Sequence, residues 1–262
     1  MKFKILSFTV CLAVVLSATS QTQTDLNKTD QQGRKQGHWI KNYPNGALMY
    51  EGTFKDDRPV GEFKRFYSDN SLKSVLIYSE DSREADATFY YPNGFISSRG
   101  KYIDQLKEGE WKFFSSEING CLINEENYAK NKQNGLSLKY YADSTLAEKI
   151  QYTDGIKTDE WIQYHPNGKI FLKANYVNGL LNGRFDTWYD NGNPHYSGVY
   201  KNNLRKGKWR ICHENGAIKY EIDFDDEKNR DLRIDEESAD FFDMIEKNMG
   251  KIQDPEKTGN IR

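Results

Sequence analysis

The four residues Tyr43-Pro44-Asn45-Gly46 decide the fold of this chain, because they recur. The same letters, YPNG, begin again at Tyr91, and the variant HPNG begins at His165. The first interval is 48 residues, or two times 24, and the second is 74 residues, or three times 24 plus two. These spacings predict a 24-residue repeat with one two-residue insertion.

Counting from Gly37 in steps of 24 divides residues 37–230 into eight units. Seven units have 24 residues, and the fourth has 26, with its two extra residues in the stretch SSEING at 115–120. We number the positions of each unit from 1 and keep the fourth unit in register after its insertion. The units are 37–60, 61–84, 85–108, 109–134, 135–158, 159–182, 183–206 and 207–230.

Aromatic residues recur in fixed columns of this alignment. Positions 3 and 6 are aromatic in six units each, and position 1 is glycine in six units. Position 18 is aromatic in all eight units, although Phe, Trp and Tyr make up only 14% of the chain, so chance does not account for this column. The members of position 18 are Phe54, Tyr78, Tyr102, Tyr128, Tyr152, Tyr176, Tyr200 and Phe224.

Each unit is predicted to form a β-hairpin. Positions 2–7 are rich in aromatic residues, as in HWIKNY at 38–43, and positions 12–18 alternate with the strand period of two. Between them, positions 8–11 hold Pro-Asn-Gly or a related sequence, which favours a turn because Asn-Gly adopts positive φ at low cost. Positions 19–24 are predicted to form a polar loop that leads into the next glycine.

A single hairpin cannot bury its apolar face alone, so the hairpins must stack. We predict an all-β fold, an elongated array of about eight hairpins, which would be on the order of 75 Å long at ~4.8 Å per strand. A sheet of this length must twist. Cys121 and Cys212 would then lie roughly 38 Å apart, which is too far for a disulfide.

The N-terminal residues differ from the repeat. Residues 1–20 combine Lys2 and Lys4, an apolar run ILSFTVCLAVVL at 5–16 and a small-residue site that ends at Ser20. This pattern is typical of a secretory signal peptide that is cleaved near Ser20, with an uncleaved anchor as the alternative. Residues 21–36 are polar, and GRKQGHW at 33–39 indicates half a repeat unit before Gly37.

Residues 231–262 also leave the repeat. The stretch DEESADFFDMIEKNMG at 235–250 places Ser238, Phe241, Phe242, Ile245 and Met249 at helical spacing. We predict a C-terminal helix that caps the exposed edge of the last hairpin, followed by a disordered tail from Asp254. A helix that binds a partner is the alternative.

The segment YEGTFKDDRPVGEFKRFYSDN at 50–70 resembles the MORN repeat, with its Tyr-x-Gly-x-aromatic start and a later Gly-x-aromatic. The 24-residue unit is similar to the bacterial MORN-variant family, whose members are often labelled antitoxins of toxin–antitoxin systems. The resemblance covers Gly37 to about Arg230 and implies a row of hairpins used for binding or scaffolding, without shared catalytic residues. An antitoxin role fits poorly with export, because an exported chain cannot easily neutralise a cytoplasmic toxin.

The sequence holds no evident catalytic or metal-binding constellation. His165 and His213 take the place of tyrosine at position 7 and would lie roughly 19 Å apart, too far to share a metal. The acidic clusters at 56–57 and 225–227 lack the ligand spacing of a calcium loop, and no glycine-rich phosphate loop is present. We predict no cofactor, no metal site and no enzymatic activity.

The formal net charge of −2 gives no reason to expect nucleic-acid binding, and contact with membrane lipid is not expected.

Position 7 provides a candidate binding surface. Positions 6 and 7 are adjacent, so in a regular strand their side chains point to opposite faces, yet both columns are aromatic. An exposed row of tyrosines offers contact area and hydroxyl groups to a partner. The alternative is that these tyrosines only shield one another and the one-layer sheet. The residues of this position-7 ladder are Tyr43, Tyr67, Tyr91, Tyr141, His165, Tyr189 and His213.

The sequence therefore predicts an exported, non-enzymatic binding or scaffold module. Its expected partner is another protein of the cell envelope or exterior, bound through one face of the repeats. A glycan-binding module of the envelope, with stacked tyrosines as platforms for sugar rings, is the alternative.

Overall fold

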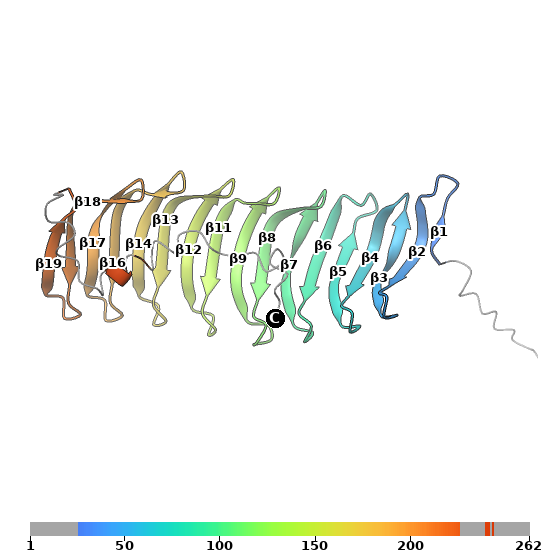
Figure 1. The fold of residues 1–262 in the computed structure, drawn as a ribbon, viewed down its shortest axis with the longest axis horizontal. Coiled ribbons are helices and arrows are strands. Elements are labelled where there is room, and N and C mark those ends of the chain that lie inside the picture. Colours follow the sequence, from blue (N-terminus) through green and yellow to red (C-terminus); the bar gives the residue numbers. More distant parts are fainter. Residues whose placement is uncertain (1–25, 226–238, 242, 244–262) are drawn as a thin grey trace, which may run out of the picture.

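The computed structural model describes residues 26–225, 239–241 and 243, and Figure 1 shows a single open sheet of stacked hairpins. Each long strand pairs antiparallel with the next long strand along the chain, as β2 does with β3 and β18 with β19. The all-β hairpin array predicted from the repeat is confirmed.

Three two-residue strands are β1 (Lys28–Thr29), β10 (Lys132–Gln133) and β15 (Leu180–Leu181). The strands of six to nine residues are β2 (Lys35–Asn42), β3 (Leu48–Lys55), β4 (Arg58–Phe66), β5 (Leu72–Tyr78), β6 (Glu84–Tyr90), β7 (Ile96–Ile103), β8 (Leu106–Phe114), β9 (Leu122–Ala129), β11 (Gly135–Tyr140), β12 (Leu146–Thr153), β13 (Ile156–Tyr164), β14 (Ile170–Val177), β16 (Gly183–Trp188), β17 (Pro194–Lys201), β18 (Leu204–Cys212) and β19 (Ile218–Asp223).

Two kinds of turn alternate along the chain, and one of them differs from the prediction. The YPNG turn spans residues 43–47 and is closed by a 2.8 Å hydrogen bond from the Tyr43 N–H to the Ala47 carbonyl. The expected polar loop at positions 19–24 is instead a two-residue turn, Asp56-Asp57 in the first unit. Both residues have positive φ, 52° and 66°. Such a turn has the twist of the strands that it joins, so β4 already begins at Arg58.

Glycine recurs at position 1 because a β-bulge lies there. In the β3–β4 pair, Gly52 pairs with Phe63 but Thr53 pairs with Val60, so Gly61 and its neighbour are extra residues. Gly61 has a φ of +65°, which glycine adopts without steric cost. Ala85 occupies position 1 of the third unit, where β5 and β6 pair without a register shift, so no positive φ is required.

Positions 3, 14, 16 and 18 place their side chains on one side of the sheet, which we call the aromatic face. The position-3 rings of Trp111, Phe185 and Trp209 are 0% exposed there. Glycine at position 16 makes room for the two tryptophans, since a Cβ added to Gly100 would lie 2.3 Å from the indole of Trp111 and one added to Gly198 would lie 2.1 Å from that of Trp209. Buried side chains of this face form one cluster in units 2 to 4 and another in units 5 to 8.

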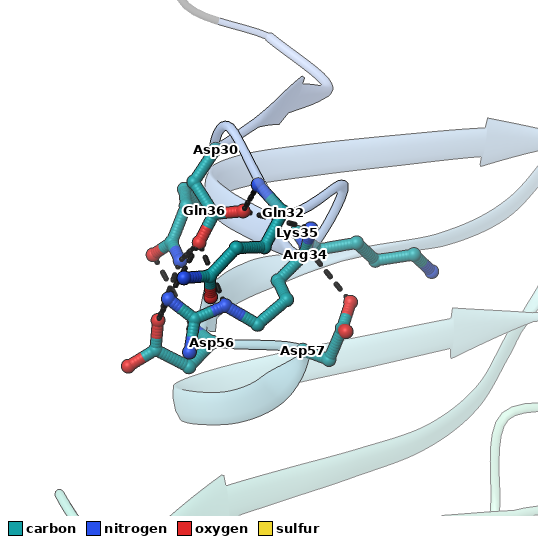
Figure 2. A network of polar contacts seen from close by, with 7 residues as sticks. All are labelled: Asp30, Gln32, Arg34, Lys35, Gln36, Asp56 and Asp57. Atoms are coloured by element: carbon teal, nitrogen blue, oxygen red, sulfur yellow. Dashed lines mark hydrogen bonds and ion pairs between the residues drawn. The ribbon is translucent and has the colours of Figure 1, made fainter.

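The strand β1 and its turn extend the array before the first unit. Figure 2 shows Asp30 at the centre of a polar network that joins this turn to the Asp56-Asp57 turn. Arg34 forms ion pairs with Asp30 at 2.7 Å and with Asp56 at 2.9 Å. Desolvation alone would raise the pKa of Asp30, but the hydrogen bonds from Arg34 lower this pKa to about 2. The acidic pair at 56–57 therefore has a structural role in holding adjacent turns together.

Residues 239–241 and 243 are helical, and Phe241 places them against the sheet. The Phe241 ring stacks on Tyr196 of β17 at 4.3 Å with a 10° angle, and it lies 6.3 Å from Phe171 of β14. The contact is thus with the aromatic face of units 6 and 7. Ser238, Phe242, Ile245 and Met249 of the predicted helix, the predicted tail from Asp254 and the predicted signal peptide at 1–20 lie outside the described residues.

The two cysteines of the array, Cys121 and Cys212, are free thiols. Within the described part of the chain, no helix has the length and apolarity needed to cross a membrane. The same residues hold no group of three His, Cys, Asp or Glu side chains that could bind a metal ion.

Candidate functional site

Six of the seven side chains of the position-7 ladder bond to the next repeat unit. Each tyrosine hydroxyl of the ladder donates to the main-chain carbonyl of position 6 in the following unit, 23 residues along the chain. The bonds run from Tyr43 to Phe66 (2.9 Å), Tyr67 to Tyr90 (2.8 Å), Tyr91 to Phe114 (3.0 Å), Tyr141 to Tyr164 (2.6 Å) and Tyr189 to Cys212 (2.9 Å). His165 makes the equivalent contact through Nε2 to Trp188 at 2.8 Å.

The asparagine of the YPNG turn has a second structural role. Asn45, Asn93 and Asn167 each donate from Nδ2 to a carbonyl 23 residues further on, at 2.9–3.0 Å. Their Oδ1 atoms accept from the main-chain N–H two residues later, which stabilises the turn itself. The motif recurs because each turn is bonded to the next one. The ladder is therefore a row of inter-unit contacts, and its rings are half-buried except that of His213, which lies in the last unit and is exposed.

A second bulge puts the ladder beside the aromatic face. In β4–β5, Arg65 pairs with Ser74 while Phe66 pairs with Leu72, so Lys73 at position 13 is an extra residue. The bulge turns positions 13 and 14 to the same side, where position 13 meets the ring of position 7. Lys73 Nζ lies 5.2 Å from the centre of the Tyr67 ring. Tyr67 and Tyr91 consequently reach the edge of a hollow on the aromatic face.

A hollow of about 610 Å³ opens on the aromatic face across units 2 to 4. It exists because small residues stand where other units have large ones. Position 14 is Ser74 and Ser98 here, against Tyr196 and Leu172 later in the array. The hollow is lined by Arg65, Tyr67, Lys73, Ser74, Leu76, Tyr78, Ser82, Arg83, Ala85, Phe89, Tyr90, Tyr91, Pro92, Ser97, Ser98, Tyr102, Gln105 and Phe113.

Within the described ranges, two cations and one buried hydroxyl of the hollow lack a polar partner. Among the residues that the structure describes, Arg65 and Lys73 form no ion pair, whereas Arg83 is paired with Asp104 at 3.1 Å. The Arg65 guanidinium lies 5.8 Å from the Phe63 ring centre. Ser74 is 1% exposed, and its Oγ has no hydrogen-bond partner in the described part of the chain. The site can therefore accept an anion beside an apolar or aromatic group.

Sequence reasoning missed a row of cations above the rings. Position 23 and its counterpart in the half unit before Gly37 carry Lys35, Lys107, Lys157 and Arg205. Lys35 Nζ lies 4.8 Å from the Trp39 ring centre and Lys107 Nζ lies 4.5 Å from that of Trp111. Such contacts stabilise a cation over an aromatic face. Comparing position 23 across the units would have revealed the row.

A largely buried carboxylate lies at position 14 of the fifth unit. The Glu148 carboxylate of β12 forms an ion pair with Lys139 Nζ at 2.7 Å. It also accepts hydrogen bonds from Gln163 Nε2 at 2.7 Å and from Trp161 Nε1 at 3.1 Å. Burial alone would raise the pKa of Glu148. The ion pair with Lys139 and the hydrogen bonds outweigh burial and lower this pKa below its ordinary value of 4.5.

Replacing Glu148 with glutamine is expected to make the unfolding free energy fall less steeply in acid. Since the folded pKa lies below the unfolded one, the stabilisation by this carboxylate is present above pH 4.5 and is lost as the pH falls through the folded value. Urea denaturation at several pH values between about 5 and about 3 would measure the slope. Glu221→Gln, at an exposed ion pair with Arg210, should keep the wild-type slope. A wild-type slope for Glu148→Gln would contradict the assignment.

The repeat geometry agrees with a family comparison. Two segments of the chain, residues 35–56 and 160–178, match the family model of the MORN repeat variant. Both lie in the sheet, at β2–β3 and β13–β14. A MORN-type open repeat sheet fits a binding or scaffold module, and such repeats are typically non-catalytic.

Neither the curated proteins nor the crystal structure of TcdB2-TccC3-TEV provides a close relative of this chain. Among curated proteins, none matches this chain. A match among solved structures is the crystal structure of TcdB2-TccC3-TEV, at 12% identity and a TM-score of 0.21, where the match covers 71% of this chain and 13% of that chain. This chain thus spans a small part of that neighbour's length, and so weak a similarity carries no argument about function.

Proposed function

We propose that the protein is an exported, non-enzymatic scaffold that binds another protein of the cell envelope or exterior through its aromatic face. Export rests on the signal-peptide pattern at 1–20, and binding rests on the open MORN-type sheet. Concave, mostly apolar surfaces with a few polar groups usually mark binding sites. The hollow in units 2 to 4 is the part of the aromatic face that is shaped to receive a side chain.

The observation that carries this proposal is the site where Phe241 packs on the sheet, which we call the seat of Phe241. This ring comes from a helical segment outside the repeats, and it lies flat on Tyr196 at 4.3 Å. The His195 ring adds a contact at 5.6 Å. The aromatic face therefore already accepts an aromatic side chain from a helix, and a helix or loop of another protein can use the same chemistry.

Affinity capture tests the proposal with two bulky substitutions. Tagged protein that begins after Ser20 would be used as bait on envelope extract and culture fluid, with mass spectrometry of the captured proteins. Ser97→Trp fills the hollow, whereas Ile77→Trp introduces the same side chain at a 56% exposed site on the opposite face. We expect a protein that binds the wild type and Ile77→Trp but not Ser97→Trp.

Two outcomes would contradict the proposal. Capture that is unaffected by Ser97→Trp would move the binding surface away from the hollow. Retention on envelope polysaccharide without any captured protein would favour the glycan-binding alternative, for which the tyrosines around the hollow would stack on sugar rings. Circular dichroism of both variants shows beforehand that the sheet is intact.

A further inference from the structure

We propose that the hollow binds an acidic protein segment through one aromatic side chain of that segment, while Arg65 and Lys73 hold its carboxylates. This inference rests on the proposed function, because it names the kind of partner segment that the aromatic face recognises. Three observations carry it: the register of the repeat, the small residues of the hollow, and the charge around it.

The hollow is the repeat equivalent of the seat of Phe241. Phe241 contacts position 13 of unit 6 and positions 13 and 14 of unit 7, through Phe171, His195 and Tyr196. Four units earlier, the same positions are Lys73, Ser97 and Ser98, and all three line the hollow. Eight strand spacings, or roughly 38 Å, separate the two places along the sheet. The same backbone geometry thus occurs twice, once filled and once open.

The open copy has more room than the filled one. Serine replaces a large side chain at position 14, so that a side chain can enter between Tyr78, Phe89 and Tyr102. Aromatic rings in such a space make stacked or edge-to-face contacts, and Phe241 makes both kinds with Tyr196 and Phe171. Ser74 supplies a buried hydroxyl oxygen without a hydrogen-bond partner in the described chain, which a tyrosine hydroxyl or an indole N–H can satisfy.

Charge identifies the segment that carries the ring. Phe241 lies in the sequence DEESADFFD at 235–243, which has five acidic residues and no basic one. At the hollow, Arg65 and Lys73 are exposed cations without an ion pair among the described residues. Arginine in particular binds carboxylates with two parallel hydrogen bonds.

The chain after Asp243 does not match these cations as well. Residues 244–262 carry more basic than acidic side chains, so their charge does not complement Arg65 and Lys73. Their basic residues are Lys247, Lys251, Lys257 and Arg262, and their acidic residues are Glu246, Asp254 and Glu256. We therefore assign the hollow to a segment of a partner protein.

A peptide-binding experiment tests this assignment. Fluorescein-labelled peptide of the sequence DEESADFFD would be titrated with the full chain, in which Phe241 occupies its own seat, and binding would be followed by fluorescence anisotropy. We expect saturable binding that Arg65→Gln/Lys73→Gln weakens at least tenfold. Lys64→Gln/Arg210→Gln removes the same charge on the opposite face and should leave the affinity within twofold of wild type. A peptide with both phenylalanines changed to alanine should also bind at least tenfold more weakly.

The location of the peptide is measured separately. A peptide with benzoylphenylalanine in place of its first phenylalanine would be photo-crosslinked, and mass spectrometry should find the link in β5 or β7. A link only at β14 or β17 would mean exchange with Phe241 and would overturn the assignment. Equal binding by Arg65→Gln/Lys73→Gln, or by a peptide with asparagine and glutamine in place of its acids, would overturn it as well.

Affinity capture and peptide binding test the scaffold and the acidic segment separately. A cellular protein whose capture is lost with Ser97→Trp but unchanged with Arg65→Gln/Lys73→Gln would support the scaffold and contradict the acidic segment. Peptide binding at β5 and β7 without any captured protein would support binding of an acidic segment and contradict the scaffold proposal. Phenylacetate is expected to compete only at concentrations at least a hundredfold above those of the peptide, and equal potency would make the hollow a small-molecule site instead.

Discussion

Gly198→Ala is expected to lower the free energy of unfolding by about 3 kcal/mol, at the upper end of the range for overpacked cores. A Cβ at residue 198 would lie 2.1 Å from Cδ2 and 2.2 Å from Cε2 of Trp209. The Trp209 ring is 0% exposed and is enclosed by Phe185, Tyr200 and Phe224, so it has little freedom to move aside. Urea denaturation followed by tryptophan fluorescence would measure the loss.

A double-mutant cycle separates this clash from other effects of alanine. If the ring causes the loss, Gly198→Ala should cost little when it is added to Trp209→Leu, which gives a coupling energy of about 2 kcal/mol. Val199→Thr, at the neighbouring 45% exposed residue, should change stability by less than about 0.5 kcal/mol. An unchanged stability of Gly198→Ala would mean that the glycines of position 16 are not required by the rings above them.

Much of the fold could be predicted because the repeat multiplies every local signal. The aromatic column at position 18 indicated the period, and the Asn-Gly pairs indicated the turns. The loop at positions 19–24 was predicted wrongly, because its residues look polar and irregular in each unit. Asp56 and Asp57 both adopt positive φ, and acidic side chains give a weaker signal for a two-residue turn than glycine does.

The site was harder to predict, because it depends on departures from the repeat. The alternation argument placed positions 6 and 7 on opposite faces, but the bulge at Lys73 brings the position-7 rings to the edge of the aromatic face. The hollow arises from Ser74 and Ser98, which are unremarkable in the sequence until the neighbouring units show what they replace. The contact between Phe241 and Tyr196 joins segments that no repeat register relates.

Replacing the five tyrosines of the ladder with phenylalanine is expected to cost about 5 kcal/mol in total, or about 1 kcal/mol for each hydroxyl. Every one of these hydroxyls donates to a carbonyl of the next unit, at 2.6–3.0 Å. Stability in an array is nearly a sum of units and their interfaces, so the losses should add. Thermal and urea denaturation of the single and fivefold variants would measure them.

The buried hydroxyl of Tyr176 provides a matched control. It has no hydrogen-bond partner among the described residues, so Tyr176→Phe removes the same atom without removing a bond and should be neutral or stabilising. If single ladder variants behave like Tyr176→Phe, the hydroxyl bonds do not hold the units together. Because phenylalanine keeps the ring, the same variants also test the hollow: Tyr67→Phe and Tyr91→Phe should lose stability yet retain the bound peptide, whereas loss of the peptide would show that these hydroxyls contact the partner.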